Sequence, residues 1–218
     1  MEDFVVWGVP GSPYVRSALL GLEEKGARWR LAPLGLADSK SPAHLARMPF
    51  GRMPVLDHGD FRLYEAQAIH RYLDRIIPTP PMTPADPRAA ARMDQVMNVT
   101  DWYVFPDVSA GVVFGRVVAP RLGLPTDEAR ITASLPRAAT CLAELARLLG
   151  DKPYFAGETV SLADLHLAPQ AAFLNDCEEG RELLAPHPTL SAWISRMEAR
   201  PSMAATTWDK MSELARAA

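Results

Sequence analysis

The fold of this chain is decided by residues 49–69, which read PFGRMPVLDHGDFRLYEAQAI. Pro54 begins a short apolar run of strand type, where a proline fits because it cannot donate a hydrogen bond to a sheet ladder. Gly51 and its neighbours supply a turn before it, so we predict a cis Met53–Pro54 peptide bond. A backbone reversed there would turn the N–H and C=O groups of Met53 outward, as at a free sheet edge. The stretch therefore predicts a surface that holds an extended peptide.

The second part of this stretch predicts a β-hairpin followed by a helix. Two apolar runs, Val55-Leu56 and Phe61–Tyr64, flank the turn-forming residues 57–60. Glu65 then opens a helix, which places an acid and the free N–H groups of a helix start beside the sheet edge.

The residues before Pro54 predict the remainder of an α/β unit. An apolar strand leads into Ser12-Pro13, where serine fits an N-cap and proline fits the first helical position. Apolar residues at helical spacing give that helix one buried face, and Lys25-Gly26 fits its end. The expected order is strand 4–7, helix from 13, strand 27–34, helix 42–47, strands 55–56 and 61–64, and a helix from 65 to about 77. This is the order of a thioredoxin-like α/β unit.

The proline-rich run PTPPMTP, residues 78–84, is the clearest linker in the sequence. Beyond it the chain shows helical periodicity and no strand pattern. The sequence therefore predicts a thioredoxin-like domain at residues 1–78, a linker at 79–87 and an all-helical domain at 88–218.

The helical half contains recognisable starts and breaks. A long helix that begins at Pro87 is expected to be interrupted at Pro106. Ser161 and Asp164 fit a capping box that nucleates a buried helix, which is a structural role. A single last helix is expected over residues 203–217.

Composition and charge exclude several classes of function. The chain has 218 residues and a formal net charge of −3, which argues against electrostatic capture of nucleic acid or of an anionic membrane. It has no apolar run long enough for a membrane span, and its acidic N-terminus argues against a signal peptide. Cys141 and Cys177 lie far apart without metal-binding spacing, so we expect two free thiols in a reducing compartment.

Residues 49–69 resemble the glutathione-binding half of a glutathione S-transferase and are most similar to the phi class of plants and bacteria. The LADLH run at residues 162–166 resembles the capping motif of the helical domain in that family. The resemblance covers nearly the whole chain. It implies a cytoplasmic, homodimeric detoxification enzyme with glutathione as co-substrate and with no metal or nucleotide. The reaction it implies is attack of a glutathione thiolate on an apolar electrophile, or reduction of a hydroperoxide.

Ser12 is the candidate catalytic residue, because serine-type members of the family place the activating hydroxyl after the first strand, at a helix N-terminus. A hydroxyl donor and the positive end of a helix both favour the thiolate form of a bound thiol. The alternative is that Ser12 only caps the helix, and the two roles compete for one side chain. The resemblance favours catalysis.

The resemblance also implies the residues that bind glutathione. Met53 and Pro54 would hold the cysteinyl backbone, and Glu65 would hold the γ-glutamyl amino group. Ala66 replaces the usual serine, so only its backbone N–H is offered to the γ-glutamyl carboxylate. Lys40 matches a lysine that contacts the glycyl carboxylate. Arg52 stands where glutamine is usual, and it either binds a carboxylate or is an exposed surface residue.

Two further expectations concern function and assembly. A non-catalytic glutathione-binding or protein-interaction module is the alternative to an enzyme, supported by Ala66 and by arginine at position 16 where the family has it at position 17. Phe50 is expected to project into a partner subunit, because an exposed phenylalanine on a loop has no other obvious reason. Five aromatic residues of the C-terminal half are available to line an electrophile pocket, and none is assigned to it: Trp102, Tyr103, Phe105, Phe114 and Trp208.

Overall fold

The computed structural model describes residues 3–217 of the chain. The chain divides into two compact units, the first made of Met1–Met82 with Ala199–Ala218 and the second of Thr83–Glu198. The first unit therefore contains both ends of the chain. The predicted linear boundaries, 1–78, 79–87 and 88–218, stay a prediction, but the helices at the C-terminus make their contacts in the first unit.

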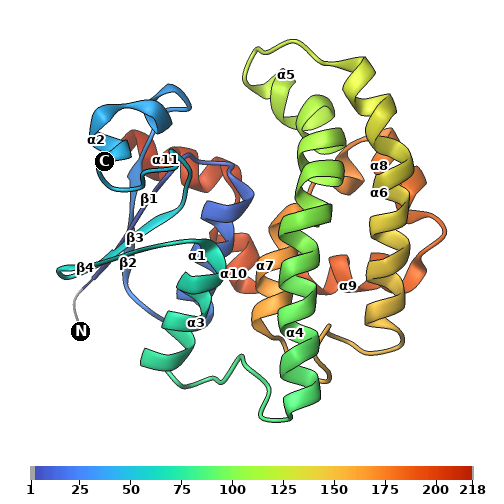
Figure 1. Ribbon diagram of the computed structural model, residues 1–218, viewed down its shortest axis with the longest axis horizontal. Helices are drawn as coiled ribbons and strands as arrows, with labels where there is room; N and C mark the ends of the chain where they lie inside the picture. Colours follow the sequence, from blue (N-terminus) through green and yellow to red (C-terminus); the bar gives the residue numbers. More distant parts are fainter. Residues whose placement is uncertain (1–2, 218) are drawn as a thin grey trace. The chain divides into compact units, whose positions relative to one another are not determined.

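The first unit is built on a four-stranded sheet in the order β2-β1-β3-β4 (Figure 1). Its strands are β1 (Phe4–Gly8), β2 (Trp29–Pro33), β3 (Val55–His58) and β4 (Phe61–Tyr64). β1 is parallel to β2 and antiparallel to β3, with Val6 opposite Leu31 on one side and Leu56 on the other. β3 and β4 form the predicted hairpin, with Val55 opposite Tyr64. The thioredoxin-like expectation for this unit is confirmed.

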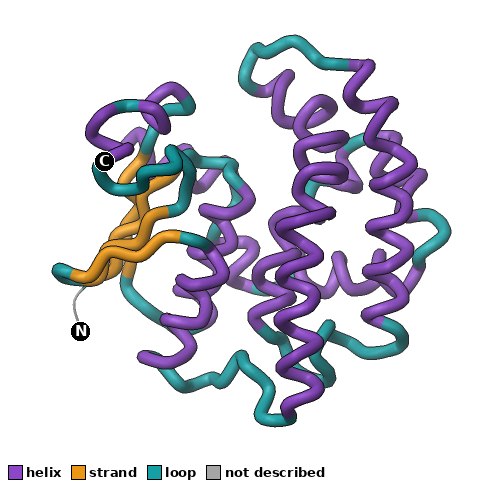
Figure 2. The backbone as a smooth tube through the Cα atoms, viewed as in Figure 1, coloured by secondary structure: helices purple, strands orange, loops and turns teal. Residues whose placement is uncertain are grey.

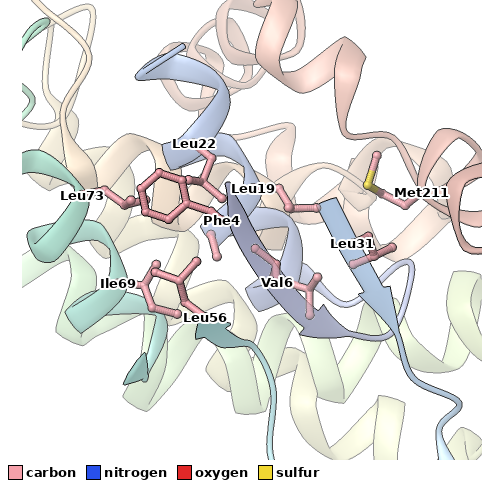
Figure 3. Packing of buried hydrophobic residues seen from close by; sticks show 11 residues of the cluster. Phe4, Val6, Leu19, Leu22, Leu31, Leu56, Ile69, Leu73 and Met211 are labelled. Carbon is pink, nitrogen blue, oxygen red and sulfur yellow. The ribbon is translucent and has the colours of Figure 1, made fainter. Parts of the chain in front are cut away.

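Two helices, α1 (Pro13–Glu24) and α3 (Ala66–Ile76), pack on this sheet, and α1 does so through the apolar face that the sequence predicts. Figure 3 shows the core between them, where Phe4 and Val6 of β1 meet Leu19 and Leu22 of α1. Alternate residues of β1 are buried, because side chains of a strand point to opposite faces of the sheet. Two short helices, η1 (Ala37–Lys40) and α2 (Pro42–Leu45), connect β2 to β3.

The C-terminal segment completes this core. It forms two helices, α10 (Pro201–Ala205) and α11 (Trp208–Ala217), where the sequence predicted one helix over residues 203–217. Thr206 leaves the helical conformation at φ −115° and ends α10. Neither glycine nor proline stands at this break, and the signal for it that the prediction missed is Thr207, whose hydroxyl lies 3.4 Å from the N–H of Lys210 at the start of α11. Met211 of α11 is buried in the same cluster as Leu31 of β2 (Figure 3).

The second unit is helical, as expected. Apart from an isolated bridge between Tyr154 and Gly157, every regular element described there is a helix (Figure 2). These are α4 (Pro87–Val99), η2 (Thr100–Val118), α5 (Ala119–Arg121), α6 (Glu128–Leu149), α7 (Leu162–Ala171), η3 (Leu174–Asp176), α8 (Glu178–Leu184) and α9 (Pro188–Glu198).

The predicted interruption at Pro106 is wrong. Pro106 lies inside η2, a continuous π-helix of 19 residues. A π-helix bonds each N–H to the carbonyl five residues back, and Gly111 lies close to the Pro106 carbonyl oxygen, at this spacing. A Cβ on Gly111 would also meet Ser134 of α6, so α6 lies close enough to support the helix from outside. Tertiary contact thus maintains a helix that an isolated proline would break.

Within the described residues, no helix combines the length and apolar character that crossing a membrane requires. In residues 3–217 there is also no group of three or more His, Cys, Asp or Glu side chains arranged to hold a metal ion. Cys141 and Cys177 are both free and buried.

Candidate functional site

The topology of the first unit gathers the predicted site residues at one end of the sheet. β1 ends at Gly8, and Ser12 follows it. Because β3 runs antiparallel to β1, it begins at that same end, directly after Pro54. β4 in turn ends there, so Glu65 follows Tyr64 next to Pro54 in the antiparallel register. Three segments of the chain, at Ser12, Pro54 and Glu65, therefore meet at one end of the sheet.

Ser12 is the N-cap of α1. Its Oγ accepts a hydrogen bond from the backbone N–H of Val15 at 3.4 Å, and Pro13 occupies the first helical turn. The half-buried Ser12 hydroxyl has no acceptor for its proton among the described residues. A hydroxyl accepts through its lone pairs and donates through its hydrogen. Capping and donation therefore use different parts of the group, and the expected competition between the two roles is not required.

The turn before Ser12 is tied to the loop that contains Met53. The backbone N–H of Val9 lies 3.3 Å from Sδ of Met53, and the N–H of Ser12 donates to the carbonyl of Val9 at 3.1 Å. The Met53–Pro54 peptide bond is cis, as predicted, and Pro54 is buried at the start of β3. The structure thus brings Met53 and Ser12 together.

The Met53 loop is held in turn by His44, which the sequence analysis missed. His44 is fully buried on α2, and its Nε2 lies 2.7 Å from the carbonyl oxygen of Arg52. A carbonyl only accepts, so Nε2 carries the proton in this contact. The N–H of Arg52 also lies 3.4 Å from Sδ of Met48. Both contacts hold the Arg52 backbone and leave its side chain exposed, and a histidine in a four-residue helix gives no sequence signal for this role.

Lys40 lies beside the same loop. A Cβ built on Gly51 would stand 3.1 Å from Nζ of Lys40 and 2.8 Å from the carbonyl oxygen of Ser39. Gly51 has φ +62°, a conformation that glycine adopts without strain, so its identity is required by both space and backbone. The ammonium group of Lys40 and the exposed guanidinium group of Arg52 therefore make this side of the site positively charged.

Glu65 is the only non-glycine residue with a positive φ among those described, at φ 71° and ψ 113°. Such a backbone costs about 1–3 kcal/mol and is concentrated at functional sites. The exposed Glu65 side chain makes no capping bond to α3, and the N–H of Ala66 has no partner in residues 3–217. The site thus presents an acid beside an open helix start.

The two residues at positions 16 and 17 make their hydrogen bonds to other helices and to the segment that follows α10. Arg16 donates through Nη2 to the carbonyl of Met203, at 2.9 Å, and its Nε lies 3.4 Å from Oγ1 of Thr206. Ser17 is buried with its Oγ 2.7 Å from Nε2 of His70 on α3. The departure at this pair of positions therefore concerns contacts between helices, not the groups gathered at the sheet edge.

Comparisons with known proteins find similarity over most of the chain. The family model for the N-terminal domain of glutathione S-transferases matches residues 6–81, and the model for the C-terminal domain matches residues 128–196. Glutathione S-transferase F14 of Arabidopsis thaliana is 34% identical over 194 residues, which cover 85% of this chain and 76% of that protein.

Solved structures show the same likeness. The crystal structure of glutathione transferase F7 from Populus trichocarpa superimposes with a TM-score of 0.82 at 27% identity, covering 97% of this chain and 99% of that one. A structure of glutathione S-transferase-I bound with the ligand lactoylglutathione gives a TM-score of 0.79 at 27% identity, covering 98% of each chain. The chain therefore belongs to the glutathione S-transferase family, is most similar to its phi class, and is an enzyme of the transferase type.

Proposed function

We propose that this protein activates glutathione through Ser12 and transfers it to an apolar electrophile or uses it to reduce a hydroperoxide. The observation that carries the proposal is the Ser12 hydroxyl, which keeps its proton available at the N-terminus of α1. A ligand of the same chemistry supports it, because the similar glutathione S-transferase-I binds lactoylglutathione.

In this mechanism, Ser12 donates a hydrogen bond to the glutathione sulfur and stabilises the thiolate. The positive end of α1 acts in the same direction. A free thiol is only a few per cent ionised at neutral pH, and each unit by which its pKa falls requires about 1.4 kcal/mol. A single hydrogen bond to a charged acceptor contributes about 1.5–3 kcal/mol, so one well-placed hydroxyl suffices for a shift of about one unit.

The remaining site residues orient the tripeptide. Met53, with Pro54 fixing the loop behind it, pairs with the cysteinyl backbone as a sheet edge pairs with a strand. Glu65 holds the γ-glutamyl amino group, and the open N–H of Ala66 takes the adjacent carboxylate. Arg52, which precedes Met53, and Lys40, which lies beside Gly51, bind the glycyl carboxylate. The charge of each group at the site thus complements the charge of the part of glutathione assigned to it.

We further propose a homodimer in which Phe50 enters the partner subunit. The Phe50 side chain is 66% exposed, and its ring touches only the edge of Tyr64 among the aromatic contacts described. Light scattering at micromolar concentration should give twice the mass of one chain, and Phe50→Ala should shift the equilibrium toward the monomer. A monomeric native protein would exclude this assembly. A small electrophile, detoxification and a cytoplasmic location complete the proposal, with no nucleic acid, membrane, metal or nucleotide as partner.

The decisive experiment is a titration of bound glutathione in Ser12→Ala. Ultraviolet absorbance of the thiolate against pH should show that the pKa of the bound thiol rises by about one unit or more, with turnover falling in step. Asp127→Ala is the matched control, because it removes a cap of the same kind, from Arg130 N–H to Asp127 at 3.0 Å, far from the site in sequence. A Ser12→Ala protein with the native titration would reduce Ser12 to a cap.

The alternative, a glutathione-binding module without turnover, rested on Ala66 and on the residues at positions 16 and 17. Ser17 and Arg16 hold helices together, so they do not indicate a lost site. Ala66 still offers its N–H. Tight binding of glutathione with no turnover on aryl halides, isothiocyanates or hydroperoxides would favour the module.

A further inference from the structure

The C-terminal segment is fastened to α1 at both ends of that helix. At the last residue of α1, the carboxylate of Glu24 accepts two hydrogen bonds from Arg200, at 2.7 and 2.6 Å, and one from the hydroxyl of Ser202 at 2.5 Å. In the first turn of α1, Arg16 donates to the carbonyl of Met203. Two arginine contacts about 12 Å apart along the helix therefore fix α10.

The second helix of this segment, α11, is anchored in the core of the first unit. Met211 is 2% exposed and lies in the cluster beneath the sheet (Figure 3). Thr207 precedes the helix, and its hydroxyl lies 3.4 Å from the N–H of Lys210. The first residue of α11, Trp208, is thus held between a fixed helix and a buried side chain.

Trp208 lies on the turn that carries Ser12. A Cβ built on Gly11 would stand 2.6 Å from two carbon atoms of the Trp208 ring, which shows that the ring covers Gly11 at contact distance. Gly11 also has φ +86°. Any larger residue there would be strained by its backbone and would collide with the ring. The turn from Val9 to Ser12 is therefore supported by Met53 at Val9 and by Trp208 at Gly11.

We propose that Trp208 is a positioning residue for the transferase reaction: it holds Gly11, and so sets the direction in which the Ser12 hydroxyl donates. The inference rests on the proposed role of Ser12 and adds a residue from the far end of the chain to it. A hydrogen bond weakens steeply as its angle departs from linearity, and small errors in placement cost large factors in rate. A turn that loses its Trp208 support donates less well to the thiolate, although every group that binds the peptide part of glutathione is retained.

The test compares Trp208→Ala with Trp208→Phe, which keeps a flat ring, and with Leu214→Ala as the control. Leu214 is 47% exposed on α11, the helix that Trp208 begins. Trp208→Ala should raise the pKa of the bound thiol by up to about one unit and lower turnover below that pKa by up to about tenfold. The dissociation constant of S-methylglutathione, which has no thiol proton, should change less than about twofold. Trp208→Phe should restore most of the loss, and Leu214→Ala should resemble the native protein.

The same titration in a Ser12→Ala background shows whether Trp208 acts through Ser12. There, Trp208→Ala should produce no further rise in the thiol pKa, because the group that it positions is absent. An equal rise in both backgrounds would overturn the inference, as would an unchanged thiol pKa in Trp208→Ala alone while Ser12→Ala raises it. If Ser12→Ala itself leaves the pKa unchanged, the proposed function fails, and the inference fails with it. Should Trp208→Ala not fold, Trp208→Leu carries the same expectation with an apolar side chain retained.

Discussion

Three helices described here, α1, α2 and α7, have a serine N-cap, and two of these serines, Ser12 and Ser161, are in opposite states. Ser161 precedes α7 in the second unit and is 1% exposed. Its hydroxyl donates to Oδ2 of Asp164 at 2.6 Å, and its N–H donates to the same oxygen at 2.9 Å. Ser12 precedes α1 in the first unit, is half-buried, and accepts one bond of 3.4 Å without donating to any described residue.

The residue three positions after each serine makes the difference. Asp164 accepts the Ser161 proton, closes the predicted capping box and also accepts from Phe155 N–H and Trp193 Nε1. Burial raises the pKa of Asp164, and these four hydrogen bonds act against that rise. After Ser12 the corresponding residue is Val15, which has no acceptor to offer. A serine cap followed by an acid is complete in itself, whereas a serine cap followed by an apolar residue keeps a donor for a ligand.

The largest effect should come from removing the acceptor at the complete cap. Asp164→Ala leaves four buried donors without their acceptor, and an unsatisfied buried donor costs about 1–3 kcal/mol. We expect the free energy of unfolding to fall by at least about 3 kcal/mol in urea denaturation. Asp164→Asn keeps one acceptor oxygen and should lose less. A loss below about 1 kcal/mol in Asp164→Ala would show that this cap is dispensable.

The two serines themselves should then separate stability from activity. Ser161→Ala removes a buried donor and a cap, so it should cost about 2 kcal/mol of stability, whereas Ser12→Ala loses one long, half-exposed bond and should cost well under that. The order reverses for function, since only Ser12→Ala should raise the pKa of the bound thiol. Thermal melts and thiolate titrations of both variants measure this. If Ser161→Ala also raised the pKa of the bound thiol, or if Ser12→Ala cost as much stability as Ser161→Ala, the two caps would not differ in function.

The features of the fold and the site that the sequence predicted are those that depend on residues close together in the chain. The Ser161–Asp164 box, the proline at the start of β3 and the helix start at Ser12 were predicted, because each is decided by residues within a few positions of one another. The apolar spacing of α1 likewise predicted its buried face, which packs on the sheet as expected.

The features that the sequence did not predict depend on contacts between residues that are distant in the sequence. The break predicted at Pro106 is absent because η2 is supported by α6, more than twenty residues away along the chain. His44 was missed because its role exists only once the carbonyl of Arg52 stands opposite it. The placement of Trp208 over Gly11 joins the two ends of the chain, and no local pattern encodes such a contact.

Another serine of the first unit, Ser202, extends the comparison and predicts a dependence on pH. Ser202 is buried and donates to Glu24, as Ser161 donates to Asp164. Burial opposes ionisation of Glu24, but the hydrogen bonds from Arg200 and Ser202 outweigh it and hold the pKa of Glu24 below its usual range. A carboxyl whose pKa is lower in the folded state stabilises the fold at pH above its unfolded-state pKa. That contribution is lost as the pH falls through the folded-state pKa.

Glu24→Gln should therefore lower stability by about 1–2 kcal/mol near neutral pH and by less at acid pH, where the native carboxylate is protonated as well. Urea denaturation of both proteins at several pH values measures the difference between them. Glu144→Gln is the control, because Glu144 pairs with Arg147 at the surface of α6. If the difference in free energy of unfolding between the native protein and Glu24→Gln stayed constant down to pH 3, Glu24 would not be the ionised partner of Arg200 and Ser202.

The smallest effect is expected at the helix start that has no side-chain cap. α3 begins after Glu65, which makes no capping bond, and Ala66 offers a backbone N–H without a hydroxyl. Ala66→Ser should add one hydrogen bond to the γ-glutamyl carboxylate, with only a small helix penalty in the first turn. Such bonds contribute about 1.5–3 kcal/mol when buried. Ala66 is 6% exposed, but Glu65 beside it is exposed, so we expect the lower end or less. Glutathione binding should tighten by roughly several-fold to tenfold, since about 1.4 kcal/mol is one decade.

Turnover at saturating glutathione should barely change, because the contact is the same in the ground and transition states. Calorimetric titration of the variant beside Ala68→Ser, two residues further along α3, measures the difference. An unchanged dissociation constant in Ala66→Ser would place the γ-glutamyl group elsewhere and would leave the open start of α3 without a ligand.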